Sequence, residues 1–221
     1  MEHTDGRTFH EEANIPKERY FNESYFTRSQ FDSLVSQLLI VHKLSPKSIL
    51  EVGPGNGFVS DFLRKSGKEV ITFDINSNLN PDVVGNLTKI EHSFSPNSFD
   101  LILCAEVLEH LPFENFESIL KQFKTIARKN VVITLPRNHH ILIDYSSKLK
   151  IPFIPYLHFN FFLRLPNRIK WENHHWEVDY TPMHSLKRLK AIMEKYFSVK
   201  DCFSDSRNRV HQFFILAKKK E

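Results

Sequence analysis

Glycines cluster at one place in this chain, and an acidic residue stands just before them. Three of the six glycines, Gly53, Gly55 and Gly57, lie within five residues, after an apolar segment that carries Glu51. Glycine adopts positive φ at little cost and lets a ligand approach the backbone closely. A helical pattern begins at Phe58, and the N-terminus of a helix offers unpaired N–H groups and a positive dipole end. The sequence therefore predicts a strand, a glycine turn and a helix that together hold a ligand.

The spacing of this turn and the charge of Glu51 restrict the ligand. Dinucleotide sites use G-x-G-x-x-G, whose third glycine packs the helix against the strand. Here the pattern is G-P-G-N-G, one residue shorter, and Phe58 stands where the third glycine would fall. The carboxylate of Glu51 would repel a pyrophosphate and attract an ammonium group. These features favour a ligand with an amino-acid end over a dinucleotide.

A second acidic residue indicates a nucleoside. The β-branched, apolar segment Glu69–Ile75 predicts a second strand, and Asp74 near its end lies 21 residues after Gly53. A carboxylate at this place can accept hydrogen bonds from both hydroxyls of a ribose. Several nucleoside cofactors carry such a ribose, so Asp74 predicts a nucleoside without identifying it.

The elements that must position these residues alternate between strand and helix. Further strands are predicted at Asp82–Leu87, Phe99–Val107 and Asn130–Pro136, with an amphipathic helix at Glu114–Arg128. Such alternation indicates a parallel sheet with right-handed crossovers, whose ligands bind at the carboxyl ends of the strands. Besides the glycine turn, five residues fall at the carboxyl ends of these strands: Glu51, Asp74, Asn86, Glu106 and Pro136.

Three stretches resemble one enzyme family. ILEVGPGNG resembles the first motif of class I S-adenosylmethionine-dependent methyltransferases, and SFDLILCAEVLEHL resembles their motif after the fourth strand. HHWEVDYTP resembles a pattern that recurs before a late helix in small-molecule methyltransferases. The resemblance covers about Ser48–Pro136 with specific motifs, and the last part of the chain by pattern only. It implies S-adenosylmethionine as cofactor and methyl transfer as the reaction.

The resemblance also implies a fold. A helix at Met183–Phe197 precedes strands at Val199–Phe203 and Gln212–Ala217, joined by the short link Ser204–Val210. So short a link cannot hold a parallel crossover, so these strands form an antiparallel hairpin. Together with the resemblance, this predicts an α/β, doubly wound, mostly parallel seven-stranded Rossmann-like sheet with an antiparallel last strand.

Roles for individual residues follow from the resemblance. In that family the glycine turn wraps the methionine part of the cofactor, the second-strand acid binds the ribose, and a polar residue after the third strand meets the adenine. The cofactor-binding residues expected at the matching positions are Glu51, Gly53, Pro54, Gly55, Gly57, Asp74, Ile75, Asn86, Leu87, Glu106 and His110. Asn86 is also compatible with a turn-forming role, and His110 with ordering the loop before Pro112.

Histidines late in the chain are candidates for a general base. A methyl on positive sulfur is already activated, so the enzyme mainly aligns the acceptor and excludes water. An alcohol, phenol or ammonium acceptor must also lose a proton, and histidine is the natural base near neutral pH. The candidates, in order, are His175, His174 and His140. No carboxylate–histidine spacing accompanies the paired histidines, so no metal ion is expected.

The chain divides into a leading segment and one domain. Residues 1–45 are expected to form an N-terminal helical cap segment, since apolar residues recur at helical spacing over Phe31–Leu44. Residues 46–221 are expected to form the methyltransferase domain. Tyr20 and Tyr25 each begin an aromatic pair ahead of the helix. In similar enzymes such a segment closes over the cofactor, but packing of these rings on the core is the preferred reading.

Residues 137–182 form an insert on the acceptor side that is too long for a plain connection. Between Arg137 and Lys170 there are six Lys/Arg and one Asp, a local charge of +5 in a chain of net charge +4. The segment IPFIPYLHFNFFLRLP is aromatic and interrupted by prolines. It is compatible with peripheral membrane contact through residues 151–170, a lid over an apolar substrate, an oligomer contact, or an insert folded on the core. Substrate choice is expected to lie here.

Composition sets outer limits on the function. A chain of 221 residues with 41% hydrophobic and 25% charged residues is typical of one globular domain. Cys104 and Cys202 are far apart in the sequence and lack the spacing of a metal site, which favours a reducing compartment. No basic and apolar signal region follows Met1, and no apolar run is long enough to span a membrane. A cytoplasmic protein is therefore expected. The basic residues form no long run, and the Asn/Asp-Pro-Pro-aromatic signature of base methylation is missing, so no nucleic-acid partner is expected.

The sequence thus predicts S-adenosylmethionine-dependent methyl transfer to a small-molecule or lipid-linked acceptor. Oxygen and nitrogen are the favoured acceptor atoms. Two alternatives stay open. A non-catalytic methyltransferase-fold binding module would be favoured if the insert filled the pocket. A dinucleotide oxidoreductase is opposed by Glu51 and by the shortened glycine spacing. The sequence leaves the oligomeric state undetermined.

Overall fold

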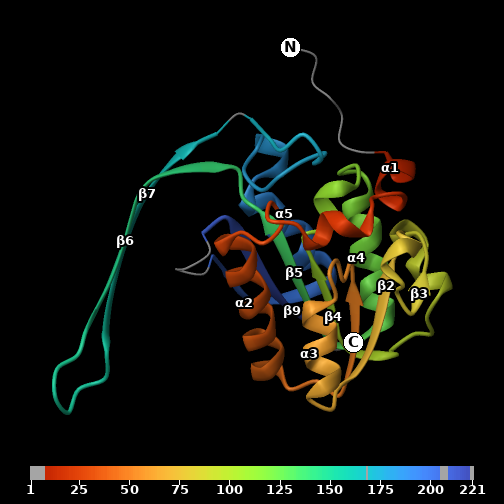
Figure 1. Ribbon diagram of the computed structural model, residues 1–221, viewed down its shortest axis with the longest axis horizontal. Helices are drawn as coiled ribbons and strands as arrows, with labels where there is room; N and C mark the ends of the chain where they lie inside the picture. The colour runs from red at the N-terminus through yellow and green to blue at the C-terminus, as the bar shows by residue number, and fades with distance from the viewer. Residues whose placement is uncertain (1–7, 168, 205–208, 220–221) are drawn as a thin grey trace.

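A seven-stranded sheet forms the centre of the protein. The computed structural model describes residues 8–167, 169–204 and 209–219 (Figure 1). The strand order is β3-β2-β1-β4-β5-β9-β8. The strands of this sheet are β1 (Ser48–Val52), β2 (Glu69–Asp74), β3 (Val83–Val84), β4 (Phe99–Ala105), β5 (Ala127–Pro136), β8 (Phe197–Phe203) and β9 (His211–Lys218).

The pairing confirms the predicted fold class. β1 pairs in parallel with β2 and β4, and β3 and β5 extend the parallel pairing on either side. β9 is antiparallel to both of its neighbours, β5 and β8. The fold is therefore α/β, with a mostly parallel seven-stranded Rossmann-like sheet whose last strand is reversed.

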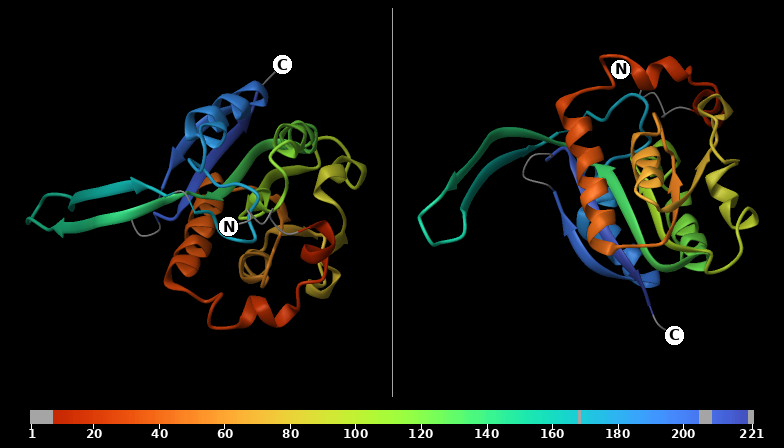
Figure 2. Two further views of the ribbon diagram at one scale, coloured as in Figure 1. Left: turned by 90° about the horizontal axis from the view of Figure 1, so that it is seen from above. Right: turned by 60° about the horizontal axis from the view of Figure 1, so that its bottom comes forward.

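Helices cover both faces of this sheet (Figure 2). The α-helices are α1 (Phe9–Ala13), α2 (Arg28–Leu44), α3 (Phe58–Lys65), α4 (Asn115–Ile126) and α5 (Leu186–Tyr196). The 3-10 helices are η1 (Lys17–Phe21), η2 (Ser77–Leu79), η3 (Leu87–His92), η4 (Leu108–His110) and η5 (Pro182–His184). α2 and α3 pack on one face of the sheet, and α4 and α5 pack on the other.

β4 shows how the sequence builds this double-sided core. Its side chains alternate between the two faces, with Leu101 and Leu103 in the apolar cluster of α2 and α3. Ile102 and Cys104 lie in the cluster of α4 and α5, and all four side chains are fully buried. A strand that is covered on both faces reads as a continuous apolar run, as this one does.

Some element boundaries differ from those predicted. The third strand is only Val83–Val84. Before it, the carboxylate of Asp82 accepts hydrogen bonds from the backbone N–H and hydroxyl of Thr72, and after it Asn86 already caps η3. The late helix α5 begins at Leu186, after a separate 3-10 turn that takes up the predicted start at Met183. Most of the predicted link between the last two strands, 205–208, lies outside the described residues.

The insert forms a long β-hairpin that extends away from the body of the protein (Figures 1 and 2). Its strands are β6 (His139–Leu149) and β7 (Leu157–Pro166), which form a separate two-stranded sheet. Large apolar side chains on both strands and at the tip are exposed. The reading of the insert as folded on the core is therefore wrong for the hairpin, residues 139–166, whereas Trp176 and Val178 in the later part of the insert are buried in the core.

The leading segment lies across the ends of the strands. α1, η1 and the start of α2 cross above the sheet on the side of the glycine turn (Figure 2), and residues 1–7 are outside the described part. Thr27 is the N-cap of α2, and its side chain accepts a hydrogen bond from the Gln30 N–H. None of the helices formed by the described residues is long and apolar enough to cross a bilayer.

Candidate functional site

A cavity of about 600 Å³ lies at the carboxyl ends of the parallel strands. Its walls come from the residues that end or follow β1, β2, β4 and β5, together with the N-terminal segment and the start of β9. This is where a parallel sheet of this kind binds its ligands. The predicted convergence of distant stretches on one edge of the sheet is therefore present in the fold.

The structure brings most of the predicted cofactor-binding residues to this cavity. The lining includes Glu51, Gly53, Pro54, Gly55, Asp74, Ile75, Asn86, Leu87, Glu106 and His110. Gly57 is not part of the lining. It occupies the N-cap of α3 with a φ of 76°, so its contribution is the turn that begins this helix. All three glycines of the turn have positive φ, as the sequence predicted.

Glu51 is a buried carboxyl group that lies between the core and the cavity. It is in β1 at 5% exposure, and among the described residues its Oε2 has no hydrogen-bond partner. Burial raises the pKa of Glu51 to about 8, although a hydrogen bond from Ser60 opposes the shift. An unpartnered carboxylate oxygen at a cavity wall is costly unless a cationic ligand meets it. The site therefore fits the ammonium group of an amino-acid ligand.

Replacement of Glu51 with glutamine is expected to remove a pH dependence of ligand binding. Below pH 8 the carboxyl of the ligand-free protein is largely protonated, and an ammonium ligand must displace that proton. Affinity for S-adenosylhomocysteine should then fall by up to about tenfold per pH unit from pH 8 to pH 6. Calorimetric titration at several pH values measures this slope, and Glu51→Gln should show weaker binding with almost no slope. An equal slope in both proteins would contradict this role of Glu51.

Asp74 and Asn86, the residues predicted to meet a nucleoside, both line the cavity. Asp74 is half-buried, and burial raises its pKa to about 6 although the Asn76 N–H donates to its Oδ1. Asn86 caps η3, because its Oδ1 accepts hydrogen bonds from the N–H and hydroxyl of Thr88. Asn86 therefore forms a turn, as one reading of the sequence expected. It also lines the cavity, so the other reading, contact with the adenine, is compatible with the structure.

Glu106 and His211 form an ion pair on the cavity wall. Their Oε2 and Nε2 atoms are 3.4 Å apart, and Ser33 donates a 2.7 Å hydrogen bond to Oε1 of Glu106. Burial alone would raise the pKa of Glu106, but His211 and Ser33 lower it to about 2. Burial would lower the pKa of His211, and Glu106 raises it above its usual value. Glu106 has a φ of 59°, which turns the chain out of β4 towards the cavity.

The three predicted base candidates lie in different places. His174 is buried and lines the cavity, with Nδ1 2.9 Å from Oε1 of Glu177. His175 is half-buried and outside the lining, and its backbone N–H donates to the carbonyl of Glu109. His140 is exposed on β6, in the projecting hairpin. The structure therefore brings His174 to the site and leaves His175 and His140 away from its wall.

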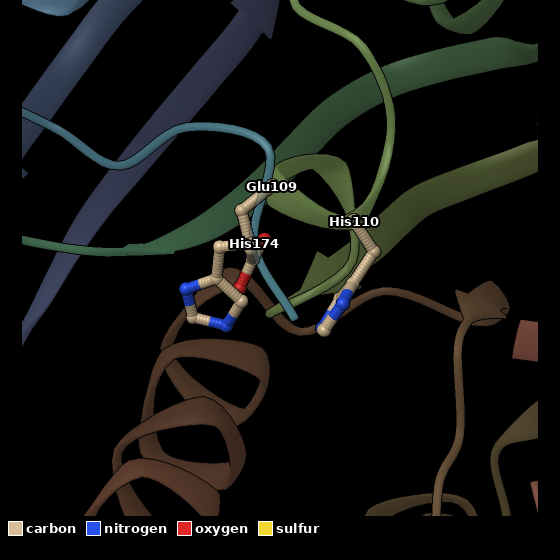
Figure 3. A group of neighbouring side chains, drawn as sticks. All are labelled: Glu109, His110 and His174. Carbon is tan, nitrogen blue, oxygen red and sulfur yellow. The ribbon is translucent and has the colours of Figure 1, made fainter. Parts of the chain in front are cut away.

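Two neighbours of His174 complete this wall. Glu109 and His110 belong to η4, directly after β4, and both line the cavity. The imidazoles of His110 and His174 meet edge to face with ring centroids 5.0 Å apart (Figure 3). Glu109 is 1% exposed, and its burial raises the pKa of its carboxyl group.

The N-terminal segment supplies another wall that the sequence reading did not favour. Tyr20 and Tyr25 line the cavity and pack edge to face with centroids 5.6 Å apart. Their partners in the aromatic pairs, Phe21 and Phe26, are exposed. The preferred reading, in which these aromatic residues pack on the core, is therefore wrong for all four rings. The tyrosines lie over Gly55, where an added Cβ would be 2.9 Å from Oη of Tyr25.

His211 and Glu109 were also missed as site residues. His211 begins β9 and pairs with Pro136 at the end of β5. Because β9 is antiparallel, its first residue lies at the same edge as the last residue of β5. The predicted hairpin of the last strands therefore contained the signal for His211. Glu109 lies within the recognised motif EVLEHL, but nothing in that pattern shows that its side chain points into a buried site.

Comparisons with known proteins agree with this geometry. A family model described as a methyltransferase domain matches residues 24–196, and a search of curated proteins found no match. The chain is similar to 1,6-didemethyltoxoflavin-N1-methyltransferase of Burkholderia thailandensis, whose structure was solved with 1,6-didemethyltoxoflavin and S-adenosylhomocysteine bound. The TM-score is 0.55 and the sequence identity is 13%, over 97% of this chain and 92% of that chain.

Two further solved structures show the same similarity. The N-methyltransferase NodS of Bradyrhizobium japonicum, in complex with S-adenosylhomocysteine, matches with TM-score 0.57 and 12% identity over 92% of this chain and 97% of that chain. Magnesium protoporphyrin IX methyltransferase of Synechocystis matches with TM-score 0.57 and 13% identity over 91% of this chain and 92% of that chain. At such identities the structures show a shared fold, whereas the family match spans most of the sequence. The chain therefore belongs to the class I S-adenosylmethionine-dependent methyltransferases.

Proposed function

We propose that this protein transfers the methyl group of S-adenosylmethionine to oxygen or nitrogen of a small-molecule or lipid-linked acceptor bound in the cavity. The observation that carries the proposal is the convergence of Glu51, the glycine turn and Asp74 on one wall. They offer a carboxylate for an ammonium group and a second carboxylate for a ribose, at opposite sides of a turn that admits close approach.

The residues of the chain have separate tasks in this reaction. When bound, S-adenosylmethionine supplies a methyl group on a positively charged sulfur. Glu51 would hold the ammonium end and Asp74 the ribose, and His110 and His174 line the same cavity, where an acceptor would bind. Tyr20 and Tyr25 close the cavity towards solvent and exclude water from the transfer.

His174 is proposed to take part in removing the proton of an alcohol, phenol or ammonium acceptor. Its Nδ1 is held by Glu177, which fixes the orientation of the ring and leaves the other nitrogen for the cavity. His175 and His140 lie off the wall and are weaker candidates. An acceptor carboxylate would need no base.

Calorimetric titration with S-adenosylhomocysteine and, separately, with NAD tests the cofactor assignment. S-adenosylhomocysteine is expected to bind with micromolar affinity, and NAD is expected to give no heat of binding. Methyl transfer is then followed as S-adenosylhomocysteine release in the presence of phenols, amines and their lipid-linked analogues. Binding without release on any acceptor would favour the alternative of a non-catalytic binding module, and heat from NAD alone would favour an oxidoreductase.

The hairpin favours a lipid-linked acceptor and a peripheral membrane contact through residues 151–170. At its tip Phe153 is fully exposed, and Ile154 and Tyr156 are also exposed. Lys148 and Lys150 flank these apolar side chains, as expected for a segment that meets an anionic bilayer surface. Arg168, part of the proposed contact, lies outside the described residues.

Serine substitution of the tip is expected to release the protein from membranes. The triple variant Phe153→Ser, Ile154→Ser, Tyr156→Ser should lower partitioning onto phosphatidylserine-containing vesicles by about tenfold or more, because each apolar side chain loses its buried site in the lipid. Vesicle sedimentation measures this. Phe62→Ser, at an exposed aromatic on α3, is the matched control and should bind as the parent does.

The same variant separates the membrane contact from the other uses of an apolar hairpin. Cofactor affinity should stay unchanged, because the tip contributes nothing to the lining of the cavity. A variant that becomes monomeric while the parent is a dimer by light scattering, with equal vesicle binding, would show an oligomer contact instead. Loss of methyl transfer to soluble acceptors alone would show a lid.

A further inference from the structure

We infer that Glu109, His110 and His174 form a binding site for one divalent transition-metal ion on the acceptor side of the cavity. Each residue offers one ligand atom, and these atoms all lie within 4.8 Å of one another (Figure 3). Ligands of one ion with bonds of about 2.0–2.2 Å lie roughly 3–4 Å apart, so small side-chain rotations close the site. This proposal departs from the expectation, drawn from the sequence spacing, that no metal ion binds.

The buried carboxylate of Glu109 is the strongest observation. The side chain is 1% exposed, and among the described residues its Oε2 has no hydrogen-bond partner. A buried carboxylate oxygen without a partner is costly, and coordination of a cation is one of the few arrangements that offset the cost. Glu109 also belongs to the lining of the cavity, so its carboxyl group lies at the wall where an ion would enter.

Both histidines are held as metal ligands are usually held. Nδ1 of His174 lies 2.9 Å from Oε1 of Glu177, and Nδ1 of His110 lies 3.2 Å from the backbone carbonyl of Asn173. A carbonyl oxygen can only accept, so Nδ1 of His110 is the donor, and Oε1 of Glu12 lies 3.3 Å from the same nitrogen. Nε2 of the neutral ring is then the nitrogen that can bind a metal ion. An outer carboxylate or carbonyl that fixes the ring in this way accompanies nearly every metal-binding histidine.

The donor set selects the class of ion. Two imidazoles and one carboxylate suit Zn²⁺ and its neighbours in the first transition row, and they leave at least one position for another ligand. Mg²⁺ and Ca²⁺ prefer oxygen donors. Because the three residues face the cavity, the open position faces the acceptor.

A metal ion here would deepen the proposed function, on which this part of the inference rests. A divalent ion beside an acceptor hydroxyl lowers the pKa of that hydroxyl, so the nucleophile forms near neutral pH. His174 would then promote loss of the proton as a ligand of the ion. An oxygen acceptor would be favoured over an amine, since a coordinated amine lone pair is not available for transfer.

Cobalt titration of the full-length protein tests the site without any acceptor. The chelator-treated protein is titrated with Co²⁺, and the visible absorption bands of bound cobalt are recorded. The protein is expected to bind one equivalent of Co²⁺, and Zn²⁺ should displace it. Glu109→Gln and His174→Ala should each weaken binding by about 100-fold or more, because each removes a ligand. Glu177→Gln should weaken it by about 10–100-fold, as loss of an outer partner does.

The controls distinguish this site from adventitious binding and from misfolding. His140→Ala removes an exposed imidazole on β6 and should bind Co²⁺ as the parent does. Glu109→Gln keeps the shape of the side chain, so it stands as an independent test if His174→Ala does not fold. The proposed site would be overturned if the protein bound no Co²⁺, or if it bound one equivalent whose affinity neither Glu109→Gln nor His174→Ala weakened.

Cofactor binding is measured in parallel on the metal-free protein. S-adenosylhomocysteine bound by a protein that takes up no cobalt would overturn the metal site and leave the proposed function standing. Cobalt bound at one equivalent by a protein that does not bind S-adenosylhomocysteine would confirm the metal site and remove the proposed function.

Discussion

Asp74→Ala is expected to weaken binding of S-adenosylhomocysteine by at least about 100-fold. The carboxylate ends β2 and lines the cavity, where the proposed function has it accept hydrogen bonds from both ribose hydroxyls. Each hydrogen bond to a charged group contributes about 1.5–3 kcal/mol, and 1.4 kcal/mol corresponds to a factor of ten in affinity. Calorimetric titration of the parent and the variant gives the ratio of dissociation constants.

Asp201→Ala is the matched control for this loss. Asp201 is an exposed acid on β8, at the far edge of the sheet, and it contributes nothing to the cavity lining. Its variant should bind as the parent does, with the same net change in charge. Less than a fivefold loss in a folded Asp74→Ala protein would mean that Asp74 does not hold the ribose.

Gly53→Ala is expected to lower the free energy of unfolding by about 3 kcal/mol and to abolish micromolar cofactor binding. Gly53 has a φ of +71°, where an L-residue costs about 1–2 kcal/mol. Its added Cβ would lie 2.3 Å from Cγ2 of Val107, and overpacking of this kind costs about 1–3 kcal/mol. Relief of the clash must move the turn or the chain after β4, and both line the cavity. Urea denaturation measures the stability.

Gly67→Ala separates the two contributions. Gly67 has a φ of +82° after α3, but an added Cβ would meet nothing within 4 Å. This variant should lose only the backbone contribution of about 1–2 kcal/mol and should keep cofactor affinity. Equal destabilisation in the two variants would show that the contact with Val107 relaxes without cost.

The parts of the site that the sequence predicted correctly are those set by backbone requirements. Gly53, Gly55 and Gly57 all adopt the positive φ that their clustering indicated. Asp74 and Glu106 follow strands whose apolar runs are unambiguous, so their place at one edge of the sheet follows from parallel pairing. Local pattern and fold topology together therefore predicted the cofactor side of the cavity.

The acceptor side depends on contacts that have no local signature. His174 and His175 are adjacent and chemically identical. Which ring reaches the wall depends on tertiary contacts, among them the contact of His174 with Glu177, the burial of Trp176 and the backbone hydrogen bond from His175 to Glu109. A charged and aromatic insert likewise fits several tertiary arrangements. Its strands β6 and β7 form a separate two-stranded sheet, and no periodicity in the sequence excludes a position on the core.

The N-terminal segment that crosses the glycine turn has a consequence for rates. Tyr20 and Tyr25 form part of the cavity wall, so we expect a bound nucleoside to exchange with solvent on that side only when the segment lifts. Lid motions of this kind take microseconds to milliseconds and often set the turnover number. We therefore expect the lifetime of the product complex, more than the transfer step itself, to limit how fast this enzyme works.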